Sequence, residues 1–340
     1  MVLQTDAEEL SAAWRALTGE DHDTDGWRTI PVAADLPVRV RAGRHFPGNT
    51  EALLVGFSSA QLRSATRLPE GRGFRVSLVD LKDAGDHVSW IALSRLGIGA
   101  LEMFAAMSAD ILNAVALLRH AGEDRIIQSF LARIAAWQYF MEQGGTSVLG
   151  VEAELGLFGE LLMLHELIDS GVEPDAAVDG WRGPLGALQD FEIGRAAIEV
   201  KSTLSSAGFP AIISSLEQLE DSPGRDLYVA AIRLAQAAAG STLPELVQRI
   251  STLLAEHPST LERFETRVLR AGLLPAHSDR YDRRLTRVER RLIPVTASFP
   301  RLTRNTVPPA ILRGWYEVDL DRVSAQAEDL DLVLSRSGAA

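Results

Sequence analysis

Residues 188–202 read LQDFEIGRAAIEVKS, and this stretch carries the clearest structural signal in the chain. Gly194 and Arg195 suit the two-residue loop of a type II′ β-hairpin, which needs glycine at its first central position. If these two residues form the loop, the pairing of the two strands is set, and Asp190 lies directly opposite Glu199. The sequence therefore predicts a tight hairpin that brings two carboxylates together.

The two strands of this hairpin present different faces, because successive side chains in a strand point to opposite sides. One face is wholly apolar and suits a protein core; it consists of Phe191, Ile193, Ala196, Ile198 and Val200. The other face is charged; it consists of Asp190, Glu192, Glu199 and Lys201. The alternation predicts a sheet that buries the first face and leaves the second for a site or for solvent.

Two carboxylates that face each other across a hairpin repel unless a cation lies between them. Hard oxygen ligands of this kind suit Mg²⁺ or Mn²⁺, which keep several waters and accept a phosphate oxygen. Asp190, Glu199 and the carbonyl of Val200 are the predicted metal ligands. Lys201 lies on the same face, where an ammonium can position an attacking water or offset charge on a phosphorane. The alternative is a solvated strand surface, and a longer loop would remove the pairing of the two acids.

Lysine is almost absent from the chain. Of 34 basic residues, only Lys82 and Lys201 are lysine. Arginine serves wherever a generic positive charge suffices, so a retained lysine indicates a role that needs a compact ammonium. Lys201 lies two residues after Glu199, where such a role is expected.

A helix is expected over residues 151–169 from the spacing of its leucines. Glu160 falls on the apolar face of this helix, near Leu157 and Leu164 on adjacent turns. A carboxylate in such a place is costly unless it is paired, hydrogen-bonded or bound to metal. Glu160 is therefore a candidate site residue; the alternative is that its side chain reaches solvent at the edge of that face.

Glu160, the pair Gln189-Asp190 and the run Ile198-Glu199-Val200-Lys201 together resemble the E…PD…(D/E)-x-K signature of restriction-endonuclease-like nucleases. The chain is similar to a bacterial group called PD-(D/E)XK family proteins, and the similarity lies in the segments GLFGELLML, WRGP, DFEI, IEVKS and SSLEQLE. The resemblance is specific over about 150–235 and looser in the C-terminal part. Gln189 stands where the signature has proline, at a position that carries no chemistry.

The resemblance implies a four-stranded mixed sheet flanked by helices and phosphodiester hydrolysis that depends on Mg²⁺, with Mn²⁺ as a substitute. In many such enzymes a glutamine on the helix after E-x-K supports the site, and Gln218 is the matching residue. Glu160 would order the site through a water or a second metal ion. The implied partners are DNA, companion restriction or phage-defence subunits and, in a homodimer, a second copy of the chain.

The chain is expected to fold as two domains that divide at Gly144-Gly145-Thr146. Residues 1–145 read as a β-rich N-terminal domain with two helices before the boundary, and we expect them to serve recognition or partner docking. Residues 146–340 read as a nuclease-like domain of the α/β class. The other expected elements are strands within 30–95, 226–234, 290–299 and 314–320, and helices at 101–118, 124–142, 243–256 and 259–271.

Composition limits the compartment and the partners of the protein. The 340 residues include no cysteine, which excludes disulfides and thiolate metal sites. The N-terminus lacks a signal-peptide pattern and no apolar stretch is long enough to span a bilayer, so a cytoplasmic protein is expected. The net charge of −12 argues against a surface that binds nucleic acid everywhere. Residues 263–304 nevertheless carry eleven arginines and four acids, which form either a phosphate-binding stripe or a solvated helical face.

These observations together predict a Mg²⁺-dependent DNA endonuclease or nickase of a restriction or phage-defence system, with the arginines of 263–304 on the phosphate backbone. The alternative from another class is a catalytically inactive scaffold that keeps the nuclease fold and binds DNA or partner subunits. The acidic composition favours this alternative, because a free-standing nuclease is usually more basic.

Overall fold

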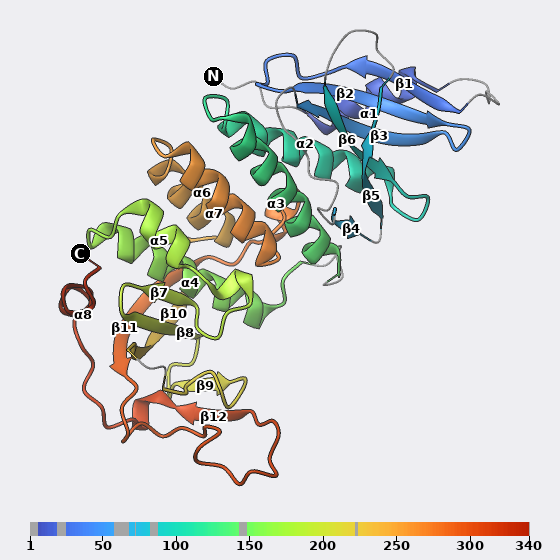
Figure 1. Ribbon diagram of the computed structural model, residues 1–340. Helices are drawn as coiled ribbons and strands as arrows, with labels where there is room; N and C mark the ends of the chain where they lie inside the picture. The colour runs from blue at the N-terminus through green and yellow to red at the C-terminus, as the bar shows by residue number, and fades with distance from the viewer. Residues whose placement is uncertain are drawn as a thin grey trace. The chain divides into compact units, whose positions relative to one another are not determined.

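The computed structural model describes residues 6–18, 25–57, 68–71, 73–81, 88–142, 148–221 and 224–339 (Figure 1). The chain divides into two compact units, Met1–Ser147 and Val148–Ala340. The boundary expected at Gly144-Gly145-Thr146 lies outside the described residues, and so does Lys82. Each unit has a sheet and helices of its own.

Within its described residues, the first unit is a six-stranded antiparallel sheet accompanied by helices. Its elements are α1 (Ala7–Ala16), β1 (Gly26–Pro31), β2 (Arg39–Phe46), β3 (Thr50–Phe57), β4 (Glu70–Gly71), β5 (Phe74–Val79), β6 (Ser89–Arg95), α2 (Leu101–Leu117) and α3 (Glu123–Glu142). The strand order is β1-β2-β3-β6-β5-β4. β3 is buried from its second residue to its last, and its apolar run from Ala52 onward suits a strand covered on both faces. The strands predicted within 30–95 and the two helices predicted after them are confirmed, whereas α1 and β1 were not predicted.

The second unit contains a four-stranded sheet in the part of the chain that the structure describes. Its strands are β7 (Phe191–Ile193), β8 (Ala196–Thr203), β10 (Asp226–Ser241) and β11 (Leu285–Pro294), in the order β11-β10-β8-β7. β10 runs parallel to β8, whereas β7 and β11 run antiparallel to their neighbours. The mixed sheet that the resemblance implied is confirmed.

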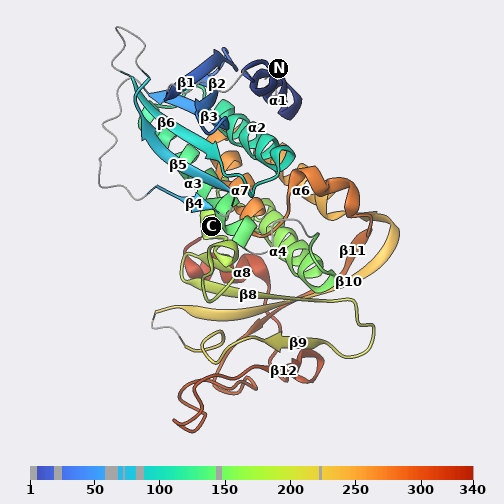
Figure 2. The same ribbon diagram turned by 90° about the vertical axis from the view of Figure 1, so that its right-hand side faces the viewer.

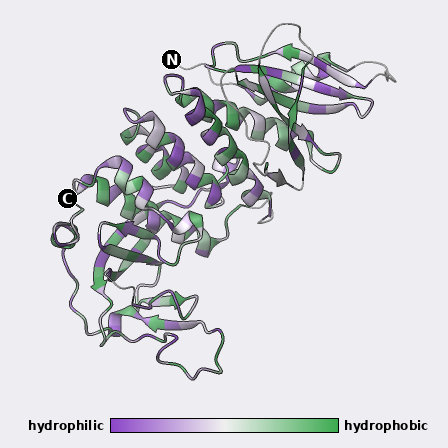
Figure 3. Cartoon of the chain, viewed as in Figure 1, coloured by the Kyte–Doolittle hydropathy of each residue, from purple (hydrophilic) through white to green (hydrophobic). Residues whose placement is uncertain are grey.

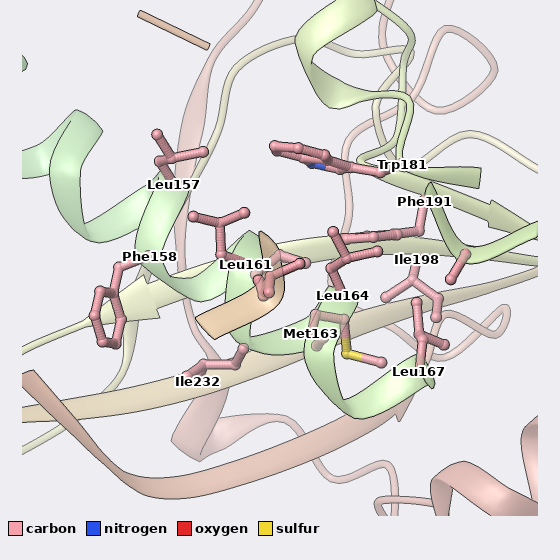
Figure 4. Packing of buried hydrophobic residues seen from close by; sticks show 14 of the residues in the cluster. Leu157, Phe158, Leu161, Met163, Leu164, Leu167, Trp181, Phe191, Ile198 and Ile232 are labelled. Carbon is pink, nitrogen blue, oxygen red and sulfur yellow. The ribbon is translucent and has the colours of Figure 1, made fainter. Parts of the chain in front are cut away.

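Helices cover one face of this sheet; they are α4 (Val151–Asp169), α5 (Pro174–Gly180), α6 (Leu243–Leu253), α7 (Pro258–Arg270) and α8 (Leu330–Ser337). Figure 4 shows Leu164 of α4 beside Phe191 and Ile198 of the hairpin, with Leu161 and then Leu157 farther along the helix, and all five belong to one buried cluster. Burying a side chain of this kind contributes about 1.5–3 kcal/mol, so the apolar face of the hairpin anchors the helices. Hydrophilic and hydrophobic segments alternate along the helices in Figure 3, as expected when one side is buried.

A two-stranded ribbon, β9 (Pro210–Ile213) with β12 (Tyr316–Asp319), covers the opposite face of the mixed sheet. Phe209 and Ile213 belong to the buried cluster that joins the ribbon to Ala197 and Val229 of the sheet. Figure 2 shows β9 and β12 on the side of β8 that is remote from α4. β12 was predicted within 314–320, but β9 was not. The part of the hairpin that carries Ala197 and Glu199 therefore lies on the side of the ribbon and is buried instead of facing open solvent.

Some predicted elements are placed differently in the structure. β11 begins at Leu285 and ends at Pro294, so the strand predicted over 290–299 is wrong in its bounds. A turn replaces its second half, where the Phe299 amide donates to the Thr296 carbonyl at 3.0 Å. α5 and α8 were not predicted. Within the described ranges, no helix combines the length and the apolar composition needed to cross a bilayer.

Candidate active site

The hairpin at the edge of the mixed sheet has the predicted strand pairing. Phe191 faces Ile198, and the turn between them begins at Gly194 with a φ of 56°. Glycine adopts a positive φ at little cost, which explains why the turn forms there. Asp190 directly precedes β7 and lies opposite Glu199 in the same register.

Backbone hydrogen bonds fix the position of Asp190. Its Oδ2 accepts from the amide of Val200 at 2.7 Å. Its carbonyl accepts from the amides of Arg182 and Gly183 at 2.6 and 3.1 Å. Because the N–H and C=O of one strand residue point to the same side, the Val200 carbonyl is also directed toward the side of Asp190.

Glu199 is almost completely buried, with 2% of its surface exposed. Its Oε1 lies 2.8 Å from the ammonium of Lys201 and accepts a hydrogen bond from the side-chain amide of Gln218 at 2.5 Å. Its Oε2 has no hydrogen-bond partner among the described residues. A buried carboxylate oxygen without a partner is costly, so this atom calls for a ligand that supplies positive charge.

Burial also sets the charge state of the acids. Desolvation raises the pKa of Glu199 to about 8, and the nearby Asp190 carboxylate adds to this rise. Desolvation raises the pKa of Asp190 to about 6, although the Val200 amide and Lys201 act in the opposite direction. Without a bound cation the site therefore retains a proton on Glu199 at neutral pH, and a divalent ion would displace it.

Glu160 of α4 is half-buried beside Asp190, and its Oε2 accepts a hydrogen bond from the indole N–H of Trp181 at 2.7 Å. Gly183 permits this arrangement, since a Cβ there would stand 2.8 Å from Asp190 Oδ1 and 2.9 Å from Glu160 Oε2. Burial first, and the Asp190 charge second, raise the pKa of Glu160 well above its ordinary value. The structure thus brings Glu160 and Asp190 together around a space that only glycine leaves open.

Gln218 contacts Glu199, but it lies in a turn after β9, so the expectation of a glutamine on a helix is wrong. Its Oε1 accepts from the Ser214 amide at 2.8 Å, which orients the side chain. Its carbonyl accepts from the side-chain amide of Gln189 at 3.0 Å. Gln189, to which the sequence assigned no role, therefore ties the approach to Asp190 to this turn.

Trp181 and Gly183 also have no role in the sequence-based prediction, although both belong to the phrase WRGP. Trp181 is fully buried against Phe264, and its carbonyl accepts a hydrogen bond from Arg267 at 3.0 Å. A buried tryptophan needs a partner for its N–H, and the available carboxylate is that of Glu160. This requirement was the signal in the sequence that could have linked the two residues.

The residues of the site fit a hard divalent cation. Asp190, Glu199 and the Val200 carbonyl supply oxygen donors, and Gly183 leaves a cradle between two acids. Glu199 Oε2 has no hydrogen-bond partner within the residues that the structure describes. Among the described residues, no group of three or more histidine and acidic side chains is placed to hold a metal ion. The main-chain carbonyl, water and substrate oxygens would therefore complete the coordination.

A family model described as "Putative PD-(D/E)XK family member, (DUF4420)" matches residues 10–321. The chain belongs to this family. Membership in this PD-(D/E)XK family points to nuclease activity, and nucleases of the PD-(D/E)XK type generally depend on divalent metal ions. The match extends beyond the signature region into the first unit. No curated protein and no solved structure matches the chain.

The arginine-rich segment 263–304 does not form an open basic stripe, because carboxylates of the second unit pair with most of it. The pairs are Arg263 with Asp175 and Asp179, Arg267 with Asp179, Arg283 with Glu154, Arg284 with Glu245, Arg287 and Arg290 with Glu166, Arg291 with Glu289 and Asp321, Arg301 with Asp221, and Arg304 with Glu217. Ion pairs reduce the charge available to phosphates. That these arginines hold a DNA backbone stays a prediction.

Proposed function

We propose that the second unit hydrolyses phosphodiester bonds of DNA, as an endonuclease or nickase that depends on Mg²⁺ or Mn²⁺. One observation carries the proposal: the buried Glu199 has an oxygen without a hydrogen-bond partner in the described part of the chain, next to Lys201 and opposite Asp190. Such an arrangement is costly in the free protein and becomes favourable when a divalent cation binds. Family membership supports the same chemistry.

In this proposal Asp190, Glu199 and the Val200 carbonyl hold the ion. Glu160 orders the site from α4 through a water or a second ion. The bound ion supplies Lewis-acid activation of the phosphate and lowers the pKa of water.

Lys201 acts on the attacking water and offsets charge that develops on the phosphorane. Its side chain is 15% exposed and is held at 2.8 Å from Glu199 Oε1, so the ammonium lies at the edge of the buried site, within reach of solvent and substrate. Gln218 keeps the Glu199 carboxylate oriented through its hydrogen bond to the same oxygen.

Lys201→Ala tests this assignment. The purified protein is expected to cut DNA with Mg²⁺ or Mn²⁺, and the variant to lower the rate by about 10²–10³-fold, because a preorganised charge is lost. Thermal unfolding reports whether the fold persists. Lys201→Arg is the matched control: it keeps the charge in a planar guanidinium, and it should also cut slowly if a compact ammonium is required. Unchanged cutting by Lys201→Ala would reject the role of this lysine.

A catalytically inactive scaffold that binds DNA or partner subunits is the second candidate function. The ion pairs that occupy the arginines of 263–304 favour it, because a nuclease needs free charge to hold its substrate. Heat stabilisation by Mg²⁺ that disappears in Asp190→Ala supports the enzyme. A protein that cuts no DNA and whose unfolding temperature ignores Mg²⁺ supports the scaffold.

The biological setting is part of the proposal. Family membership is compatible with a role in restriction or phage defence, in the cytoplasm and with companion subunits. The first unit would then serve recognition or partner docking, and a homodimer would place two sites on one DNA. Size-exclusion chromatography with and without DNA measures the last of these expectations.

A further inference from the structure

Exposed apolar side chains lie on two segments that each contact the turn 216–218, whose Gln218 bonds to Glu199. Leu185 ends a short 3-10 helix and Leu188 lies in the stretch between it and Asp190, whereas Leu312 and Trp315 belong to the segment that leads into β12. Trp315 has 75% of its surface exposed, and Leu188 has 54%. These four residues are named the apolar rim.

Hydrogen bonds connect the first half of the apolar rim to the site. Gln189, which follows Leu188, donates from its side-chain amide to the carbonyl of Gln218 at 3.0 Å. Gln218 in turn donates to Glu199 Oε1 at 2.5 Å. The loop that carries Leu188 is therefore two hydrogen bonds away from the most buried carboxylate of the site.

The second half of the apolar rim rests on the same turn. A Cβ on Gly314 would stand 3.2 Å from the side chain of Leu216, so the chain just before Trp315 packs closely on this turn. Arg304 donates to Glu217 Oε1 at 2.6 Å and fixes the same segment from its other end. Figures 1 and 2 both show the chain that leads into β12 beside the ribbon.

Residues 301–315 carry positive charge and no acid, and the acid-free stretch ends at Glu317. Arg301 and Arg304 are engaged in ion pairs. Arg313 is exposed and makes no ion pair with a described residue. An exposed aromatic ring beside an unpaired arginine is a combination with which proteins hold unpaired bases and their phosphates.

We infer that the substrate is DNA with unpaired bases, a single strand or a frayed duplex end, whose bases stack on Trp315 while Arg313 contacts the phosphates. This inference rests on the nuclease function proposed above. Bases inside an intact duplex stack on each other and offer no free ring face. Proteins that hold a duplex also use many free lysines and arginines on its phosphates, and the arginines of 263–304 are largely paired.

Binding is measured on the full chain without metal ions, so that no cutting occurs. A dye-labelled single-stranded DNA oligonucleotide and the duplex of the same sequence are titrated, and fluorescence anisotropy reports binding. Wild type is expected to bind the single strand more tightly. Trp315→Ala should weaken this binding by about 5- to 150-fold, the effect of losing one stacked base. Trp315→Phe should keep most of the affinity, because it keeps a ring face.

Leu332→Ala is the control, because Leu332 on α8 is about as exposed as Leu188 and lies outside the apolar rim. This variant should bind like wild type, whereas Leu188→Ser should bind the single strand more weakly. Affinity should fall only shallowly with salt, since few phosphates are neutralised. Equal single-strand binding by Trp315→Ala and wild type, or tighter binding of the duplex by wild type, would overturn the inference.

Cutting assays separate this inference from the proposed function. Metal-dependent cutting of duplex DNA that Lys201→Ala abolishes and Trp315→Ala leaves unchanged keeps the nuclease and rejects the unpaired substrate. Single-strand binding that depends on Trp315, without cutting of any DNA in Mg²⁺ or Mn²⁺, keeps the stacking surface and rejects hydrolysis.

Discussion

Glu199 and Asp190 lie in surroundings that disfavour their charged forms. Desolvation raises both pKa values, and Lys201 offsets only part of the cost. Glu160 adds a third acid, held by the indole of Trp181. Under the proposed function, stability and metal binding would be coupled at this site, since a divalent ion would relieve a cost that folding imposes.

The metal-free protein is expected to lose stability as pH rises from about 5 to about 8. The pKa of Glu199 is about 8 in the folded protein and near its ordinary 4.5 when unfolded. The protonated form is thus favoured by folding, so its stabilising effect is complete below the unfolded pKa and is lost as pH rises through about 8. Thermal unfolding of the metal-free protein between about pH 5 and 9 measures this.

Glu199→Gln is the control for this pH dependence, because the amide keeps the shape of the side chain and cannot ionise. The variant should unfold at a temperature that changes less with pH, and Mg²⁺ should no longer raise that temperature. The same pH slope in both proteins would contradict the assignment of the proton to Glu199.

Gly183→Ala is expected to displace the acids of the site while leaving all their functional groups in place. The new Cβ would meet oxygens of Asp190 and Glu160 at 2.8 and 2.9 Å, so the two carboxylates must move apart. A displacement of about 1 Å can lower the rate about 10²-fold. Gly156→Ala in α4 is the control: its Cβ meets nothing within 4 Å, so stability should rise by about 0.4–1 kcal/mol. Cutting assays and urea unfolding distinguish the two outcomes. Normal Mg²⁺-dependent cutting by Gly183→Ala would contradict the role of Gly183 in leaving space between Asp190 and Glu160.

Among the elements, the hairpin is the one that the sequence predicts best, because its signal is local. Gly194 marks the turn, and strict alternation assigns each side chain to a face. β9 gives no such signal: it is short, begins with proline, and pairs with β12 about a hundred residues later. Gln218 was expected on a helix because the resemblance implied one, but here it lies in a turn after β9. The start of β11 was missed because it is rich in arginine instead of apolar residues. Arg287 and Arg290 in this strand pair with Glu166 of α4.

Gly194→Ala is expected to destabilise the second unit by about 1–3 kcal/mol, the cost of holding a residue with a side chain at positive φ. Its φ is 56°, and the added Cβ would also lie 2.5 Å from the carbonyl oxygen of Ser337. Arg195→Ala alters the other loop residue without either penalty and serves as the control. Urea unfolding measures both variants, and equal stability would show that the turn is not of the predicted type.

At the scale of the whole molecule, the hydrophobic clusters follow the order of the chain, whereas the ion pairs do not. The two hydrophobic clusters that enclose the mixed sheet draw all their residues from 148 onward. The sequence places the domain boundary at Gly144-Gly145-Thr146, and that boundary stays a prediction. The sequence did not predict how the arginines are used, because a count of charges along the chain does not show which acids face them after folding, as Glu166 faces Arg287 and Arg290.

The fragment Val148–Ala340 is expected to fold by itself, since it has a complete core and the size of an ordinary domain. Circular dichroism should show one cooperative thermal transition, and Mg²⁺ should raise its midpoint as in the full chain. A broad transition, or one that ignores Mg²⁺ while the full chain responds, would show that the first unit is needed to complete the fold.

The covering of Glu199 by a ribbon has a consequence for the order of events during folding. The amide of Phe209, at the start of the ribbon, bonds to Asp319 across 110 residues of sequence. Closing so long a loop costs entropy before any contact repays it, so β9 and β12 should join after the helices have docked on the mixed sheet. The glutamine that orients Glu199 arrives with this last step. A chain arrested just before it would be compact and would lack the oriented carboxylate that the site needs.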